Sequence, residues 1–197
     1  MSAPETTEPK SSNRPFFIAF LIGAVVLTAL PLLQERFLKA PPPILQLTPW
    51  TSSAGEVSSI ALTGKVVLVQ VEVSPCDAEC GKRVTDFGAI TNHVSDLGDK
   101  IVLVTLADTG AMATLEAQRK LASPAWRFAE PDPALLTQLQ VGLVKFLGAD
   151  STEFTRSHSL VLLDQDGSVR GYWQTGDVGR GNAINAARLL AKKGPAP

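Results

Sequence analysis

Two cysteines, Cys76 and Cys80, carry the most reactive side chains of this 197-residue chain, which has no others of that type. They lie four positions apart in the stretch VSPCDAECGK, between a β-branched run and a helical pattern. Cysteines at this spacing share one face of a helical turn, and the unpaired N–H groups at a helix start stabilise a thiolate. We expect Cys76 to lie near the first turn. The pair indicates thiolate chemistry at a strand-to-helix junction.

Three kinds of chemistry fit this spacing. Soft thiolates select Cu(I) or zinc over hard cations, but two donors make only half of a metal site. A thioredoxin-type redox centre normally has two intervening residues, and the acidic Asp77 and Glu79 oppose thiolate formation. A structural disulfide across so short a loop would add little stability by loop closure. The spacing therefore leaves a metal site, a redox pair and a structural bridge open.

A third ligand would have to come from outside the cysteine stretch, and the chain has two histidines. His93 lies near the end of the helix that the cysteines begin, about 20 Å away at about 1.5 Å per residue, so we expect a surface residue. His158 stands at the head of the strand SLVLLD, just after a loop. By itself, a lone histidine there is more often structural than a ligand.

The elements that must position these residues follow from the apolar pattern. Strand-like and helix-like segments alternate in the order β-α-β-α-β-α-β-β-α, and DQDG marks a hairpin turn near the end. The expected strands are 65–73, 100–108, 125–130 and the hairpin 157–173, and the expected helices are 77–98, 109–122, 132–148 and 177–194. This order predicts an α/β, thioredoxin-like fold in which helices flank a central mixed sheet.

The N-terminal part has a different composition. We expect a polar tail over 1–15, a transmembrane anchor over 16–34, a Pro-rich linker over 35–56 and the thioredoxin-like domain over 57–197. The uncharged run 16–33 would span about 27 Å as a helix, close to the hydrocarbon core of a bilayer. A cleaved signal peptide is the alternative, but the run is long for one and lacks an A-x-A-like site. No cysteine follows closely, so lipoprotein attachment is excluded.

Charge gives little information about partners. The 18 basic and 19 acidic residues nearly cancel, and the basic ones are scattered rather than gathered in a stripe. We therefore expect no nucleic-acid partner.

Two stretches resemble the Sco/SenC copper chaperones of cytochrome c oxidase assembly. GKVVLVQVEVSPCDAEC is similar to their strand leading into C-x-x-x-C, and SHSLVLLDQDGSVRGYW is similar to their His-Ser, strand and Asp-x-x-Gly hairpin. The resemblance covers roughly 64–192, and the order of anchor, spacer and thioredoxin-like domain also agrees. The chain departs from the family pattern at Asp77 and Gly81, where the family usually has proline, and at Ser157, where it usually has an acidic residue.

The resemblance implies that Cys76, Cys80 and His158 bind copper. It also implies a metallochaperone for the dinuclear copper centre of cytochrome c oxidase, with subunit II as the acceptor. Because the cysteines must be reduced to bind copper, we expect a thiol reductase as a second partner in an oxidising compartment. The expected location is the bacterial inner membrane, with one transmembrane span and the soluble domain in the periplasm.

Two other functions stay open. In a thiol-disulfide oxidoreductase, Cys76 would attack and Cys80 would resolve, keeping the oxidase cysteines reduced. Enzyme activity, if present, would be of this kind. A membrane-anchored adaptor with a vestigial site would tolerate the loss of both cysteines.

Overall fold

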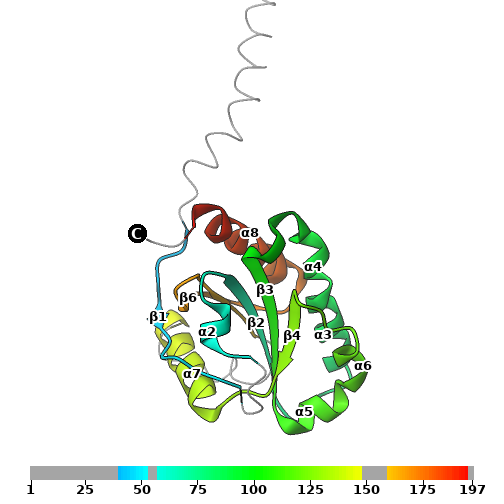
Figure 1. The fold of residues 1–197 in the computed structure, drawn as a ribbon. Helices are drawn as coiled ribbons and strands as arrows, with labels where there is room; N and C mark the ends of the chain where they lie inside the picture. Colours follow the sequence, from blue (N-terminus) through cyan, green and yellow to red (C-terminus); the bar gives the residue numbers. More distant parts are fainter. Residues whose placement is uncertain (1–39, 53–56, 148–158, 195–197) are drawn as a thin grey trace, which may run out of the picture. The chain divides into compact units, whose positions relative to one another are not determined.

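The computed structural model describes residues 40–52, 57–147 and 159–194 (Figure 1). The expected anchor, 16–34, lies outside these residues, as does the polar tail. Within the described ranges, every helix is too short or too polar to pass through a lipid bilayer.

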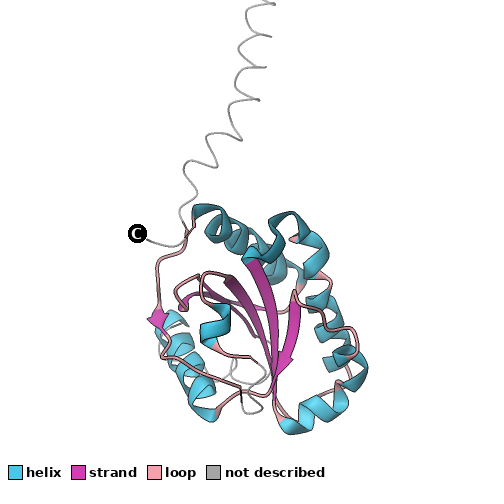
Figure 2. Ribbon diagram, viewed as in Figure 1, coloured by secondary structure: helices cyan, strands magenta, loops and turns pink. Residues whose placement is uncertain are grey.

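A six-stranded mixed sheet forms the centre of the fold (Figure 2). Its order is β1-β6-β5-β2-β3-β4, with β2, β3 and β4 parallel and the other pairings antiparallel. The strands are β1 (Leu45–Gln46), β2 (Val66–Glu72), β3 (Ile101–Ala107), β4 (Trp126–Ala129), β5 (Ser159–Leu163) and β6 (Ser168–Gln174). The first three expected strands are confirmed, each one residue shorter at either end. The hairpin is confirmed from Ser159 onward and ends at Gln174, one residue beyond its expected end.

The two central parallel strands are apolar for a physical reason. All seven residues of β3 are buried, and in β2 only Val71 is partly exposed. Helices cover both faces of these strands, so neither face of the pleat reaches water and the apolar run is nearly continuous. Two polar residues interrupt the run in β2, the fully buried Gln70 and Glu72.

Helices cover both faces of the sheet and enclose two hydrophobic cores (Figure 1). One core lies under α3, α5 and α8, and the other under α2 and α7. The helices are α2 (Ser59–Leu62), α3 (Cys80–Gly88), α4 (Ile90–His93), α5 (Thr109–Thr114), α6 (Glu116–Arg119), α7 (Pro133–Leu147) and α8 (Asp177–Lys193), with a 3-10 helix η1 (Ser95–Lys100).

The helix expected over 77–98 is wrong as a single element. It starts at Cys80 and breaks into α3, α4 and η1. The segment after Ala89 reads ITNHVSD, in which β-branched and small polar residues have low helix propensity. Gly98 lies inside η1 and kinks it with a φ of 57°, a conformation that favours glycine.

The folded unit includes part of the segment expected to be a linker. Leu45–Gln46 pairs with β6 as an edge strand, and Leu47 and Trp50 are buried in the core beneath α7. The compact unit that contains the sheet begins at Ala40, upstream of the expected start at Val57. The apolar pattern over 44–50 is short and directly follows the three prolines 41–43, so it does not reveal a strand that only tertiary pairing stabilises.

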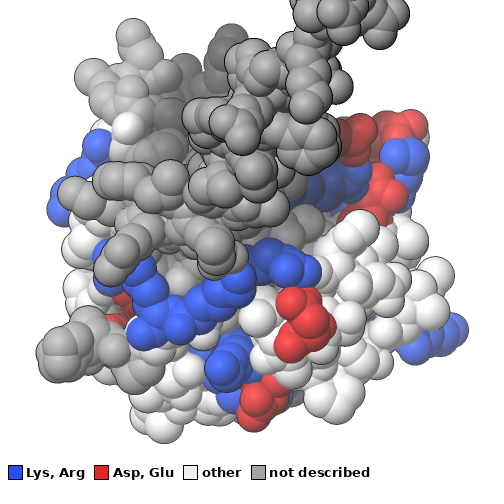
Figure 3. Space-filling model, turned by 90° about the horizontal axis from the view of Figure 1, so that it is seen from above, with Lys and Arg blue, Asp and Glu red and all other residues white. Residues whose placement is uncertain are grey.

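The described surface carries both signs of charge. On the face in Figure 3, basic and acidic side chains lie close to one another. Among the described residues, several charged side chains form ion pairs with a neighbour on the adjacent turn of the same helix, such as Lys82 with Asp86 at 3.0 Å.

Candidate functional site

The cysteines lie where β2 leads into α3. Strand β2 ends at Glu72, a loop follows, and α3 begins at Cys80. Cys76 and Cys80 form a disulfide, with their Cα atoms 5.5 Å apart. Cys80 is fully buried, whereas Cys76 is only partly buried. The strand-to-helix junction is confirmed, but Cys76 lies in the loop before the helix rather than in its first turn.

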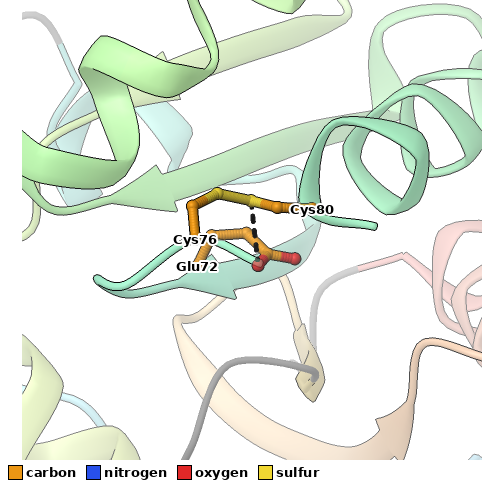
Figure 4. Close-up of side chains that lie close together, drawn as sticks. All are labelled: Glu72, Cys76 and Cys80. Carbon is orange, nitrogen blue, oxygen red and sulfur yellow. Dashed lines mark hydrogen bonds between the residues drawn. A yellow bond between two sulfur atoms is a disulfide. The ribbon is translucent and has the colours of Figure 1, made fainter. Parts of the chain in front are cut away.

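A buried carboxylate lies beside the two sulfurs (Figure 4). Glu72 Oε2 is 3.6 Å from Cys80 Sγ. One ligand atom from each of Glu72, Cys76 and Cys80 lies within 4.8 Å of the others, so the three side chains could hold a metal ion once the disulfide is reduced. Glu72 was not among the residues predicted from sequence. The available signal was an acidic residue at the end of a strand that is apolar apart from Gln70.

Two neighbours stabilise the carboxylate of Glu72. Gln70 Nε2 donates to Glu72 Oε1 at 2.7 Å, and Arg83 Nη2 donates to Glu72 Oε2 at 3.2 Å. Within the described residues, Gln70 Oε1 is buried without a hydrogen-bond partner. Because a buried charge is costly unless it is paired, the contact with Arg83 is what makes an ionised Glu72 tolerable here.

Arg83 also contacts the loop between the cysteines. Its Nη1 donates to Asp77 Oδ1 at 2.8 Å. Burial would lower the pKa of Arg83, but its hydrogen bonds to Glu72 and Asp77 outweigh that effect and raise the pKa, so the guanidinium stays charged. The negative charge of Asp77, expected from sequence to oppose a thiolate, is therefore paired with a cation.

A second contact fixes the loop before Cys76. The Ser74 N–H and the Ser74 hydroxyl both donate to the carboxylate of Asp108, which also caps α5 by accepting from the Ala111 N–H at 2.8 Å. Ser74 can lie this close to the start of α5 because residue 110 is glycine, where a Cβ would lie 2.2 Å from Ser74 Oγ. The peptide bond between Ser74 and Pro75 is cis. The loop that leads into Cys76 is therefore hydrogen-bonded to the residue that follows β3.

The structure describes one of the two histidines, His93. His93 is exposed at the end of α4, which confirms the expected surface position. His158 lies outside the described residues. The next residue in sequence, Ser159, begins β5 and pairs with Val71 of β2, one residue before Glu72.

Comparison with known proteins gives matches in structure alone. No protein-family model matches the chain, and no curated protein has a significantly similar sequence. BsSco, a member of the Sco family of cytochrome c oxidase assembly proteins with a disulfide switch, matches with a TM-score of 0.56 and 15% identity, over 79% of this chain and 98% of that one.

Two further solved structures are similar. A SCO1/SenC family lipoprotein from Bacillus anthracis str. Ames has a TM-score of 0.56 at 15% identity, covering 78% of this chain and 99% of that one. A thiol:disulfide interchange protein of the thioredoxin family from Chlorobium tepidum TLS has a TM-score of 0.51 at 16% identity, covering 78% and 98%.

These matches establish the fold. The chain has the thioredoxin-like fold of the Sco proteins, which confirms the expected fold of the described domain and the resemblance to Sco/SenC proteins at that level. A thiol:disulfide interchange protein shares the same architecture. Because one fold hosts several activities, the choice between them has to come from the site itself.

Proposed function

We propose that this chain is a membrane-anchored copper metallochaperone that serves the dinuclear copper centre of cytochrome c oxidase. Copper is its cargo, held by the thiolates of Cys76 and Cys80 and by the imidazole of His158. The segment 16–34 anchors the chain in the bacterial inner membrane, and the thioredoxin-like domain faces the periplasm.

One observation carries the proposal, namely the cysteine pair at the end of β2. The two sulfurs are close enough to be bonded to one another, so after reduction two thiolates lie side by side. Adjacent thiolates are soft donors that prefer Cu(I) over hard cations. Cys76 is only partly buried, so an acceptor can approach the pair from the side of the loop.

The register of the sheet supports His158 as the third ligand. Ser159 pairs with Val71, so β5 begins beside the end of β2 that leads into the cysteines. The residue preceding Ser159 in sequence is His158. An imidazole added to two thiolates gives a three-coordinate site, which an incoming thiolate of the acceptor can enter stepwise.

The acceptor in this proposal is subunit II of cytochrome c oxidase. Cysteine binds a metal as a deprotonated thiolate. Cys76 and Cys80 are joined in a disulfide, so copper loading requires prior reduction. In an oxidising compartment a thiol reductase supplies that reduction. The similar BsSco belongs to a family of oxidase assembly proteins and has a disulfide switch, which agrees with both steps.

A specific observation favours a second candidate, a thiol-disulfide oxidoreductase. The cysteines are joined in a disulfide, and Cys80 Sγ lies 3.6 Å from a carboxylate that could accept a thiol proton. In this role Cys76, the less buried of the two cysteines, attacks and Cys80 resolves. The substrates are the oxidase cysteines before they receive copper.

Copper titration of the reduced full chain separates these functions. We expect one copper per chain for the natural sequence, read by mass spectrometry and by competition with a Cu(I) chelator. Cys76→Ser and Cys80→Ser should abolish high-affinity binding, and His158→Ala should weaken it by at least tenfold.

His93→Ala is the matched control, because it removes the other histidine, which is exposed and distant in sequence. It should bind copper like the natural chain. Absence of binding by the reduced chain, or unchanged binding by His158→Ala, contradicts the three-ligand site. Disulfide exchange activity without copper binding would favour the oxidoreductase.

A further inference from the structure

Arg83 connects three parts of the site with one guanidinium. It belongs to the first turn of α3 and reaches Glu72 at the end of β2 (3.2 Å) and Asp77 in the loop between the cysteines (2.8 Å). Its side chain is 16% exposed. Helix, strand and loop are therefore joined at a point that has no part in the proposed copper ligation.

Arg83 offsets the negative charge of Glu72. The side chain of Glu72 is only 1% exposed, and Arg83 is the basic residue that pairs with it. The carboxylate also lies 3.6 Å from Cys80 Sγ. A negative sulfur at Cys80 would be repelled by an uncompensated carboxylate at that distance, because water does not screen charges well in a buried site.

We propose that Arg83 is a positioning residue for the chemistry of the cysteine pair. Its cation offsets the charge of Glu72 beside Cys80 and thereby favours the reduced pair. The inference rests on the proposed function in one respect, that the pair cycles between disulfide and thiolates.

The redox step can be written with a simple dithiol. One thiolate of dithiothreitol attacks a sulfur of the Cys76–Cys80 disulfide, forms a mixed disulfide and releases one cysteine thiolate. The second dithiothreitol thiol then displaces the other cysteine, and the reagent leaves as a cyclic disulfide. Two electrons pass to the protein. Cys80 leaves the neutral disulfide as a thiolate, 3.6 Å from the buried carboxylate of Glu72. Arg83 offsets the charge of that carboxylate, so it stabilises the reduced state relative to the oxidised one.

The first test is the dithiothreitol equilibrium of the full chain at one fixed pH, the same for every variant. Arg83→Met removes the cation and keeps most of the side-chain length. We expect its equilibrium constant for reduction to fall about tenfold, equivalent to a potential about 30 mV more negative. Arg83→Lys keeps the charge but not the two-armed contact, so it should lie between Arg83→Met and the natural chain.

Lys82→Met is the matched control on the same helix. Lys82 pairs with Asp86, and its side chain is 70% exposed, so this variant changes net charge by the same amount without touching Glu72. Its equilibrium constant should stay within about twofold of the natural chain, because exposed charges are screened.

Replacement of Glu72 gives a readout that a purely structural role would not produce. Glu72→Gln alone should make the disulfide easier to reduce, the direction opposite to Arg83→Met. The double variant Arg83→Met with Glu72→Gln should return to within about threefold of the natural chain. Circular dichroism verifies that each variant is folded, and Arg83→Lys still tests the inference if Arg83→Met does not fold.

An unchanged equilibrium in Arg83→Met, or a double variant no closer to the natural chain than Arg83→Met, overturns the inference. The measurement uses no copper, so its outcome is separate from that of the proposed function. A chain that binds no copper but shows the opposite shifts for Arg83 and Glu72 would refute the chaperone function alone. A chain that binds copper without those shifts would refute the role of Arg83 alone.

Discussion

The carboxylate of Asp108 accepts two hydrogen bonds from Ser74, one from the backbone N–H and one from the hydroxyl, each 2.7 Å long. Ser74 lies two residues before Cys76, and Asp108 caps the helix that follows the neighbouring strand. The contact therefore fixes one side of the cysteine loop, while the contact between Asp77 and Arg83 fixes the other.

The contact between Asp108 and Ser74 predicts a pH-dependent part of the stability. Partial burial would raise the pKa of Asp108, but hydrogen bonds from Ser74 and Ala111 outweigh it and hold the pKa below its ordinary value. A lowered folded pKa means that the contribution is fully present above the unfolded pKa of about 3.9 and is lost as the pH falls through the folded value. Asp108→Asn should lower the free energy of unfolding by about 1–2 kcal/mol at neutral pH.

Denaturant unfolding of the natural chain and of Asp108→Asn between about pH 2 and pH 7 measures the difference in their free energies of unfolding. It should shrink as the pH falls below about 4. Ser74→Ala, which removes only the hydroxyl donor, should give a smaller loss at neutral pH. A difference between the natural chain and Asp108→Asn that stays constant over the whole range would contradict the assignment.

The disulfide should contribute little to global stability. It closes a loop of only five residues, for which loop-closure entropy gives about 2 kcal/mol at most. Reduction with dithiothreitol should therefore lower the free energy of unfolding by about 2 kcal/mol or less, measured in guanidinium. Cys76→Ser should unfold alike with and without reductant. A loss above about 4 kcal/mol would identify the bridge as a structural staple.

Two glycines within helices predict opposite effects of added side chains. A Cβ at Gly142 in α7 would lie 2.3 Å from the hydroxyl of Tyr172, which donates to the Leu139 carbonyl at 2.8 Å. Gly142→Ala should therefore destabilise the fold by about 1–3 kcal/mol. A Cβ at Gly181 in α8 meets nothing within 4 Å, so Gly181→Ala should stabilise by about 0.5–1 kcal/mol.

Thermal unfolding of the two variants measures this pair of effects. Both exchange glycine for alanine in a helix, so the difference between them isolates the contact with Tyr172. Equal melting temperatures would show that Tyr172 and α7 move apart without loss of stability.

Some elements of the fold could be predicted because their signals are local. The buried strands β2 and β3 read as apolar runs, and α7 begins after Asp132 with Pro133 at its first position. Other elements could not be predicted. Strand β1 has two residues and exists because β6 pairs with it, and the break after α3 depends on several weak helix formers whose effect is settled by packing.

The candidate site divides in the same way. The sequence by itself determined that Cys76 and Cys80 stand at a strand-to-helix junction, because spacing and apolar pattern are properties of one segment. Only the tertiary structure decided that Glu72 lies against the pair and is paired with Arg83, and that Asp108, which follows β3, holds Ser74. The physical reason is that charge compensation depends on distances in space between residues whose types, taken one by one, are ordinary on a protein surface.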